Sequence, residues 1–302
     1  MTRTLRVGSR RSTLARAQAG IVFRGLGRRY ADLDLKLVTM ATSGDARAVR
    51  GSSPDFTDTL DRALLRGRID LAVHSAKDLP ATLAEGLRLV SCPRRADNRD
   101  CLVLRRSPSE GPLAHGARVG SSSVRRRAQL LRWRSDLKVV QLRGNVDSRL
   151  ARVDDGSVDA AILAVAGLLR LGREDRITTV LPRREFLPAP AQGALAVVVR
   201  SDDRAAAAIA ASVDHRATFQ AVAAERAFVR ELGGDCDVPI GAHATVRDDT
   251  LVLTGEVLSP DGRKRLRGIT RGPRHNPLRL GRTLGRSLLE QGARELLLGR
   301  GR

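Results

Sequence analysis

The stretch Leu71-Ala-Val-His-Ser-Ala-Lys-Asp-Leu-Pro80 sets the interpretation of the whole chain. Its apolar residues alternate from Ile69 onward as they do in a buried strand, and the proline prevents simple continuation of that strand. Polar side chains are therefore expected just beyond the carboxyl end of the strand, where open α/β sheets bind ligands. These side chains are Ser75, Lys77 and Asp78. A carboxylate among cations can hold an N–H-bearing substrate whose anionic groups the cations bind, although a solvated turn is the plainer alternative.

The composition is that of a globular protein. Hydrophobic residues make up 42% and charged residues 29% of 302 residues, which suggests two or three domains with a sizeable core. There is no apolar run of ~18 residues, the length needed to span a membrane, and the first residues lead straight into a strand. We therefore expect a cytoplasmic protein without a membrane partner.

The formal net charge of +21 raises the question of nucleic-acid binding. Lysine occurs at only four positions, so the positive charge is almost all arginine spread along the chain. Aromatic residues are 2%, which leaves few rings for bases to stack on, and zinc-finger and basic-zipper patterns are absent. A small polyanionic ligand explains the arginine clusters as well, so we expect no nucleic-acid partner.

Cys92, Cys101 and Cys236 are odd in number and have no C-x-x-C spacing. A disulfide framework and a metal site are therefore not expected, but one thiol is available for chemistry. Two aspartates flank Cys236 and should raise its pKa, which argues against a standing thiolate. A buried filler is the alternative for this residue.

The first lobe is predicted as an α/β unit with a parallel sheet. A strand at 5–9 is followed by a helix capped by Ser12, and Arg10 lies at the start of that helix, where backbone N–H groups favour anions. Further strands are expected at 33–37, 69–73 and 87–92, with a helix at about 59–66. The polar segment 41–58 is interpreted as a loop that could act as a lid.

The second lobe repeats this plan. Arg118-Val-Gly-Ser121 has the same sequence as Arg6-Val-Gly-Ser9, and a helix capped by Ser122 or Ser123 follows it. The helix begins with three arginines, which oppose the helix dipole, and an anionic ligand held there is one explanation. The alternative is that each arginine covers surface with its apolar stem. Strands are expected at 101–104, 138–142 and 159–165. Further arginines follow the strand ends, at Arg143, Arg149 and Arg170.

The last third of the chain indicates a small α+β domain. The proline-containing segment 187–193 crosses over, and a strand at 194–199 is interpreted as returning to the first lobe. A long amphipathic helix at 216–232 ends at a glycine pair. An antiparallel meander at 244–247, 251–257 and 265–271 and a closing helix from about 278 to 298 complete the domain.

Several ordered motifs then match one family. They are Val73-His-Ser-Ala-Lys-Asp78, Gly120-Ser-Ser-Ser-Val-Arg-Arg126, Leu142-Arg-Gly-Asn145, Leu163-Ala-Val-Ala-Gly-Leu168, Gln192-Gly193, Ala224-Glu-Arg-Ala227, and Gly234-Asp-Cys with Val238-Pro-Ile-Gly241. Together they resemble porphobilinogen deaminase, also called hydroxymethylbilane synthase. The resemblance implies two periplasmic-binding-protein-like lobes with a cleft between them, at 1–93 with 194–212 and at 99–187, and a C-terminal α+β domain at 216–302.

The resemblance implies a monomeric transferase that condenses four porphobilinogen molecules, with loss of ammonia, and releases hydroxymethylbilane in haem synthesis. It implies that a dipyrromethane cofactor is attached to Cys236. It also implies that Asp78 is the catalytic acid/base. The matching cofactor-binding positions are Ser75, Lys77, Ser123, Arg125, Arg126 and Arg143. The matching substrate-binding positions are Arg10, Ser12, Arg149 and Arg170.

One segment departs from the family pattern. Where the family usually has a glycine- and lysine-rich lid, this chain has a shorter segment, 50–60, which keeps Phe56 but lacks the lysines. This departure leaves a divergent paralogue with altered turnover as an alternative. A non-catalytic anion-binding protein on the same scaffold is another, and it predicts no covalent pyrrole on Cys236.

Overall fold

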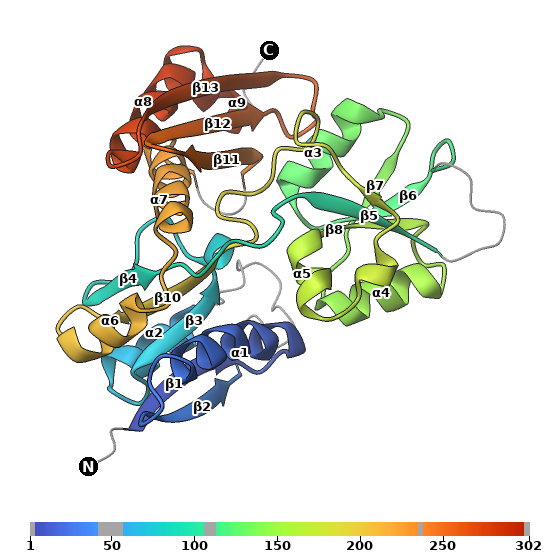
Figure 1. Cartoon of the computed structure of the whole chain (residues 1–302). Helices are drawn as coiled ribbons and strands as arrows, with labels where there is room; N and C mark the ends of the chain where they lie inside the picture. The colour runs from blue at the N-terminus through green and yellow to red at the C-terminus, as the bar shows by residue number, and fades with distance from the viewer. Residues whose placement is uncertain (1–3, 42–56, 106–112, 235–237, 299–302) are drawn as a thin grey trace. The chain divides into compact units, whose positions relative to one another are not determined.

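The computed structural model describes residues 4–41, 57–105, 113–234 and 238–298. The chain divides into two compact units, each built from two separate segments (Figure 1). The first unit contains residues 1–96 and 194–219, and the second contains 97–193 and 220–302. None of the helices in the described part of the chain is long and apolar enough to cross a membrane.

The first unit contains a five-stranded sheet in the order β2-β1-β3-β10-β4. The strands are β1 (Thr4–Arg10), β2 (Asp34–Met40), β3 (Leu71–Ser75), β4 (Leu87–Ser91) and β10 (Leu195–Arg200). The helices are α1 (Thr13–Gly27), α2 (Asp58–Leu65) and α6 (Arg204–Ala211), and a 3-10 turn, η1 (Ala76–Asp78), follows β3. α1 packs on one face of the sheet through Val22 and Leu26, which are fully buried with Leu5 and Leu71.

The return of the 194–199 strand to the first lobe is confirmed, but the expectation of a parallel sheet is wrong in part. β1 pairs in parallel with β2 and β3, whereas β10 pairs antiparallel with both β3 and β4. β10 runs the other way because it enters the sheet from the crossover segment rather than through a strand–helix–strand connection.

The second unit contains a sheet of equivalent topology, in the order β7-β6-β8-β5-β9. Its strands are β5 (Asp100–Leu104), β6 (Arg118–Gly120), β7 (Lys138–Val140), β8 (Ala160–Ala164) and β9 (Thr179–Val180). Its helices are α3 (Val124–Trp133), α4 (Val146–Asp154), α5 (Val165–Arg170) and the short 3-10 turn η2 (Glu174–Arg176). Here too one strand, β6, pairs in parallel with both of its neighbours, β7 and β8, and the next strand, β5, pairs antiparallel with β8. The repeat inferred from the sequence is therefore a repeat of structure.

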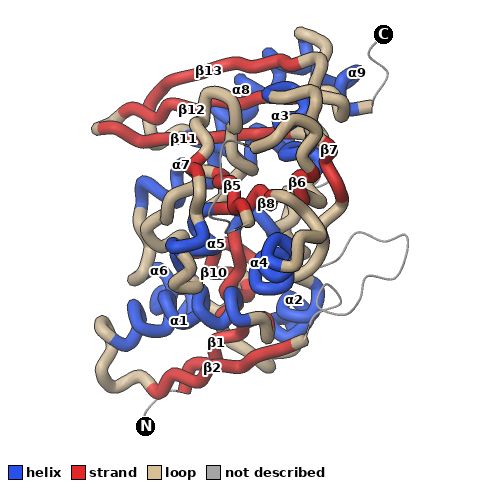
Figure 2. The backbone as a smooth tube through the Cα atoms, turned by 90° about the vertical axis from the view of Figure 1, so that its right-hand side faces the viewer, coloured by secondary structure: helices blue, strands red, loops and turns tan. Residues whose placement is uncertain are grey.

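A three-stranded antiparallel sheet, β11-β12-β13, completes the second unit. Its strands are β11 (Ile240–Arg247), β12 (Thr250–Leu258) and β13 (Arg265–Pro273), preceded by helix α7 (Arg216–Glu231). Helix α8 (Pro277–Glu290) lies against this sheet (Figure 2), and its Leu284 packs beside Gly268 of β13. The predicted α/β fold with a small separate C-terminal sheet is confirmed.

The closing helix is not continuous, which corrects the expectation of one helix from 278 to 298. α8 ends at Glu290 and α9 (Ala293–Leu297) begins after Gly292. Gly292 has φ +93°, a left-handed conformation that glycine adopts without steric cost and that ends an α-helix.

Candidate active site

A small pocket opens where the carboxyl ends of β1 and β3 meet the start of α1. Its volume is about 50 Å³, room for one functional group rather than for a whole ligand. It is lined by Arg10, Ser12, Leu14, Ala15, Gln18, Val73, His74, Ser75 and Asp78. The structure therefore brings together four of the predicted site residues, two from the first strand–helix turn and two from the Leu71–Pro80 stretch.

Local structure positions these residues. Ser12 is the N-cap of α1, and its hydroxyl accepts a hydrogen bond from the Ala15 N–H at 3.3 Å. Ser75 is the last residue of β3, and its Oγ accepts from Gln18 Nε2 at 2.8 Å. Asp78 ends η1, whose first residue, Ala76, donates its N–H to Ala194 O at 3.0 Å. Lys77 lies between Ser75 and Asp78 on the same turn.

His74 is a pocket residue that the sequence interpretation did not single out. Its side chain is buried, and burial together with the nearby charge of Arg10 lowers its pKa to about 4. At neutral pH the ring is therefore uncharged. Its Nε2 has no hydrogen-bond partner among the described residues. His74 therefore lines the pocket as a neutral ring and not as a second positive charge.

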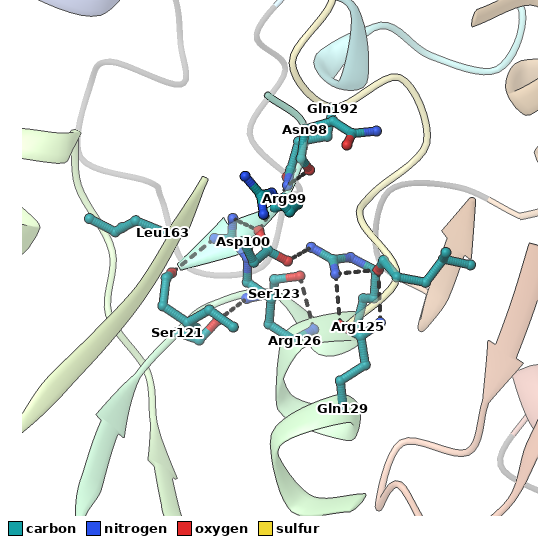
Figure 3. Close-up of polar contacts among 12 residues, drawn as sticks. Asn98, Arg99, Asp100, Ser121, Ser123, Arg125, Arg126, Gln129, Leu163 and Gln192 are labelled. Carbon is teal, nitrogen blue, oxygen red and sulfur yellow. Dashed lines mark hydrogen bonds and ion pairs between the residues drawn. The ribbon is translucent and has the colours of Figure 1, made fainter. Parts of the chain in front are cut away.

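Three of the predicted residues of the second unit lie at the start of α3. Ser123 is the N-cap, and its hydroxyl accepts from the Arg126 N–H at 3.4 Å. Arg125 and Arg126 follow in the first turn and are 3% and 6% exposed, so both are core residues and not surface cations. Figure 3 shows their guanidinium groups on either side of Asp100.

Asp100 is the carboxylate that the arginine-rich helix start calls for. Its Oδ2 accepts from Arg125 Nη2 at 2.8 Å, and its Oδ1 accepts from Arg126 Nη2 at 2.7 Å. The two guanidinium groups lower the pKa of Asp100 well below its usual range, although burial opposes them. Sequence reasoning missed this residue, whose only signal is an acidic side chain at the first position of an otherwise apolar strand.

Asp100 does not use all the donors of the two guanidinium groups. Arg126 Nη1 also donates to Ile162 O at 3.1 Å, and Gln192 Nε2 donates to Asp100 at 2.8 Å, so the cluster is held by neutral groups as well. Arg125 Nε is buried without a hydrogen-bond partner in the described part of the chain. The start of α3 therefore keeps an unused buried donor on a cationic group, which favours binding of an anion.

The other predicted arginines lie at the ends of neighbouring elements. Arg143 is exposed after β7, and Arg149 on α4 donates from Nε to Gly144 O at 2.9 Å. Arg170, the last residue of α5, donates from Nη2 to Gly193 O at 2.6 Å. Burial lowers the pKa of Arg170 to about 10, so it remains a cation at neutral pH. Arg170 Nε has no hydrogen-bond partner among the described residues.

Two features of the sequence interpretation lie outside the described residues. These are Cys236 and nearly all of the predicted lid segment, 42–56. Cys92 and Cys101, by contrast, are described and are buried thiols. Burial raises the pKa of Cys101 to about 12, which makes that thiol unreactive at neutral pH.

Comparison with known proteins identifies the family. Residues 5–208 match the family model "Porphobilinogen deaminase, dipyromethane cofactor binding domain", and residues 219–290 match "Porphobilinogen deaminase, C-terminal domain". Among solved structures, the periplasmic VFT2 domain of Bordetella pertussis BvgS is similar with a TM-score of 0.44 and 18% identity, covering 70% of this chain and 86% of that chain.

Curated relatives align over almost their whole length. The porphobilinogen deaminase of Moorella thermoacetica is 46% identical over 97% of this chain and 95% of its own. Those of Pelotomaculum thermopropionicum and Thermus thermophilus are 45% and 44% identical, each over 98% of this chain and over 97% and 98% of their own. The chain therefore belongs to the porphobilinogen deaminase family of tetrapyrrole-forming enzymes.

Proposed function

We propose that this chain condenses four porphobilinogen molecules head to tail on a dipyrromethane attached to Cys236, and that it releases hydroxymethylbilane. The observation that carries the proposal is the first-unit pocket. It is lined by the carboxylate of Asp78, the guanidinium of Arg10 and the hydroxyl groups of Ser12 and Ser75. Such a set suits a substrate that offers both N–H donors and carboxylates. We expect the enzyme to act as a cytoplasmic monomer.

Asp78 is proposed as the acid/base of the reaction. Loss of ammonia from the aminomethyl group of porphobilinogen leaves positive charge on the substrate, and a nearby carboxylate stabilises that charge. The same carboxylate can accept a pyrrole N–H hydrogen bond and can carry a proton at Oδ. The pocket is large enough for one polar group of the substrate, and Arg10 and Ser12 on its wall would hold a carboxylate there.

The arginines of the second unit are proposed to bind the acetate and propionate groups of the growing chain. Each added ring brings two carboxylates, so the bound chain becomes a polyanion. Arg125 and Arg126 share one protein carboxylate, and Arg125 and Arg170 each keep a buried Nε donor. A ligand carboxylate at these positions would complete the hydrogen bonding and balance the charge.

The donor set also fits the dipyrromethane group. Ser123, Arg125, Arg126 and Arg143 of the second unit would hold carboxylates of the group, and Cys236 would carry it through a thioether. Ser75 and Lys77 are proposed as the cofactor-binding residues of the first unit. When bound, the group supplies the terminal pyrrole ring to which a new ring is joined. The role of the chain is to fix that group, to exclude competing anions and to hold the acid/base carboxylate of Asp78.

The mass of the intact protein under denaturing conditions tests this function directly. We expect an excess equal to one dipyrromethane, located by peptide mapping on the peptide that contains Cys236. The peptides that contain Cys92 and Cys101 serve as internal controls and should be unmodified, because both thiols are buried. An unmodified Cys236 after incubation with porphobilinogen would instead support the non-catalytic anion-binding protein, and normal modification with slow turnover would support the divergent paralogue.

A further inference from the structure

We propose that Gln129 is a positioning residue, which holds the Arg125 guanidinium in place for the carboxylates of the bound pyrrole chain and is itself anchored by Glu256 of the C-terminal sheet. The inference rests on the proposed function of Arg125. It adds two residues that lie outside every motif quoted above, and it connects the arginine cluster to the small sheet within the second unit.

Gln129 lies one helical turn after Arg125 on α3, so the two side chains share a face of the helix. Its Oε1 accepts a hydrogen bond from Arg125 Nη1 at 2.7 Å, as Figure 3 shows. Its Nε2 donates to Leu187 O at 2.8 Å and to Glu256 Oε1 at 2.6 Å. The side chain is 1% exposed, and both of its amide hydrogens are used.

The carbonyl oxygen of Leu187 closes this arrangement. It accepts from Arg125 Nη1 at 2.7 Å as well as from Gln129 Nε2. Arg125 Nη1 therefore has two acceptors, Leu187 O and Gln129 Oε1. Nη2 on the neighbouring edge is bound to Asp100. Three fixed acceptors therefore set the plane of the guanidinium and leave Nε as the donor without a partner. A planar group with one unused edge is positioned to bind a carboxylate in a single orientation.

Glu256 is an anchor that cannot move into solvent. It lies in β12 and is fully buried, and burial raises the pKa of its carboxyl group although Gln129 and nearby arginines oppose this. Arg267 Nη1 lies 3.6 Å from Glu256 Oε2. The hydrogen bond from Gln129 therefore joins α3 to an immobile group in a different sheet.

The same sheet approaches α3 at a second point. Gly262, in the turn between β12 and β13, has φ +75°, and a Cβ there would lie 2.2 Å from Ala128 O. Ala128 immediately precedes Gln129, so the backbone contact and the side-chain contact are adjacent. The C-terminal sheet and its turn thus contact α3 at two neighbouring residues, one turn after Arg125.

The test uses the full-length protein, three single variants and one double variant, Arg125→Lys with Gln129→Met. Gln129→Met keeps the volume of the side chain but removes its hydrogen bonds. Arg125→Lys removes the planar guanidinium, and Gln220→Met is the matched control, because Gln220 is also buried and its Oε1 accepts from Arg274 Nε at 2.9 Å. The readouts are kcat/KM for porphobilinogen, the fraction of molecules that carry dipyrromethane by intact mass, and the free energy of unfolding in urea.

We expect Gln129→Met to lower kcat/KM about tenfold and to lower the loaded fraction, whereas Gln220→Met should affect only the unfolding free energy. In the Arg125→Lys background, Gln129→Met should have little further effect on kcat/KM, because its target is gone. The positioning role would be overturned if the loss of kcat/KM in the double variant were the product of the two single losses. It would also be overturned if Gln129→Met behaved like the Gln220→Met control.

Two further comparisons separate the possible failures. An Arg125→Lys protein with normal kcat/KM and a normal loaded fraction would overturn the proposed function of Arg125 and this inference with it. A loss in Arg125→Lys without one in Gln129→Met would overturn the inference alone. If Gln129→Met does not fold, two variants of Glu256 replace it: Glu256→Leu removes the anchor without altering α3, and Glu256→Gln keeps an acceptor. We expect a lower fraction of dipyrromethane-loaded molecules in Glu256→Leu only. An equal loaded fraction in the two variants would contradict the proposal.

Discussion

Arg118 pairs with Asp159 in the second unit through the same backbone and Nη2 contacts by which Arg6 pairs with Asp70 in the first. Arg6 donates its N–H and its Nη2 to the Asp70 carboxylate at 2.7 and 2.8 Å, and Asp70 returns its own N–H to Arg6 O at 2.9 Å. Arg118 donates its N–H and its Nη2 to Asp159 at 2.7 and 3.0 Å, and Asp159 returns its N–H at 2.9 Å. The repeated Arg-Val-Gly-Ser sequence thus marks a repeated ion pair between equivalent strands.

The two ion pairs should differ in what they contribute to stability. The side chain of Asp70 is 12% exposed and also accepts from Arg6 Nε, whereas that of Asp159 is 45% exposed. We expect Asp70→Asn to lower the free energy of unfolding by about 2 kcal/mol and Asp159→Asn by less than about 1 kcal/mol. Urea unfolding of the two variants checks the order, and equal losses would show that burial of the carboxylate does not decide the difference.

Asp78→Asn tests the acid/base assignment. The amide keeps the shape of the side chain but cannot accept a proton or balance positive charge, so kcat should fall by about 10² to 10⁴. The free energy of unfolding should change little, because Asp78 is only half-buried. Asp202→Asn is the control, since Asp202 is an exposed carboxylate in the same unit. Turnover near that of the control would refute the role of Asp78.

His74 should make stability depend on pH. Its pKa in the folded protein is about 4, below the ordinary value of 6.5, so the unfolded chain binds the proton more readily between these values. The contribution is therefore complete above pH 6.5 and is lost as the pH falls to 4, with a total of up to about 3 kcal/mol. His74→Asn should remove this part of the slope, and the exposed His275→Asn should not.

Asp100 should affect the free energy of unfolding over a lower pH range than His74. Its folded-state pKa is depressed, so its contribution is present above the unfolded value near about 4 and is lost at lower pH. Asp100→Asn leaves two buried guanidinium groups uncompensated and should cost about 3 to 5 kcal/mol at pH 7. The difference from wild type in urea unfolding should shrink below about pH 4. Asp248→Asn, which removes an exposed acidic residue, should show no such pH-dependent difference.

The elements that the sequence predicted well depend on short-range signals. Ser12 and Ser123 cap their helices as their positions indicate. The strand expected at 69–73 is present but lies two residues later, at Leu71–Ser75, so Ser75 is its last residue and not just beyond it. Those structures follow from residues three or four positions apart, which local hydrogen bonds and steric limits decide. The same reasoning placed Asp78 just beyond a strand end.

The parts that the sequence did not reveal depend on distant partners. Asp100 is 25 residues from Arg125, and Gln129 is 127 residues from Glu256. No local pattern specifies which carboxylate or amide will meet a buried arginine, because that is decided by how the sheets and helices pack. The reversed direction of β10 has the same origin, since it depends on the route of the chain through the second unit.

The position of β10 also has a consequence for the order of folding during synthesis. β10 lies between β3 and β4, yet the ribosome makes it about one hundred residues after β4. Until then β3 and β4 have no strand between them, and their backbone groups on that side are open to pairing with other chains. The strands of the second-lobe sheet, β5 to β9, are therefore all synthesised before the first-lobe sheet can close.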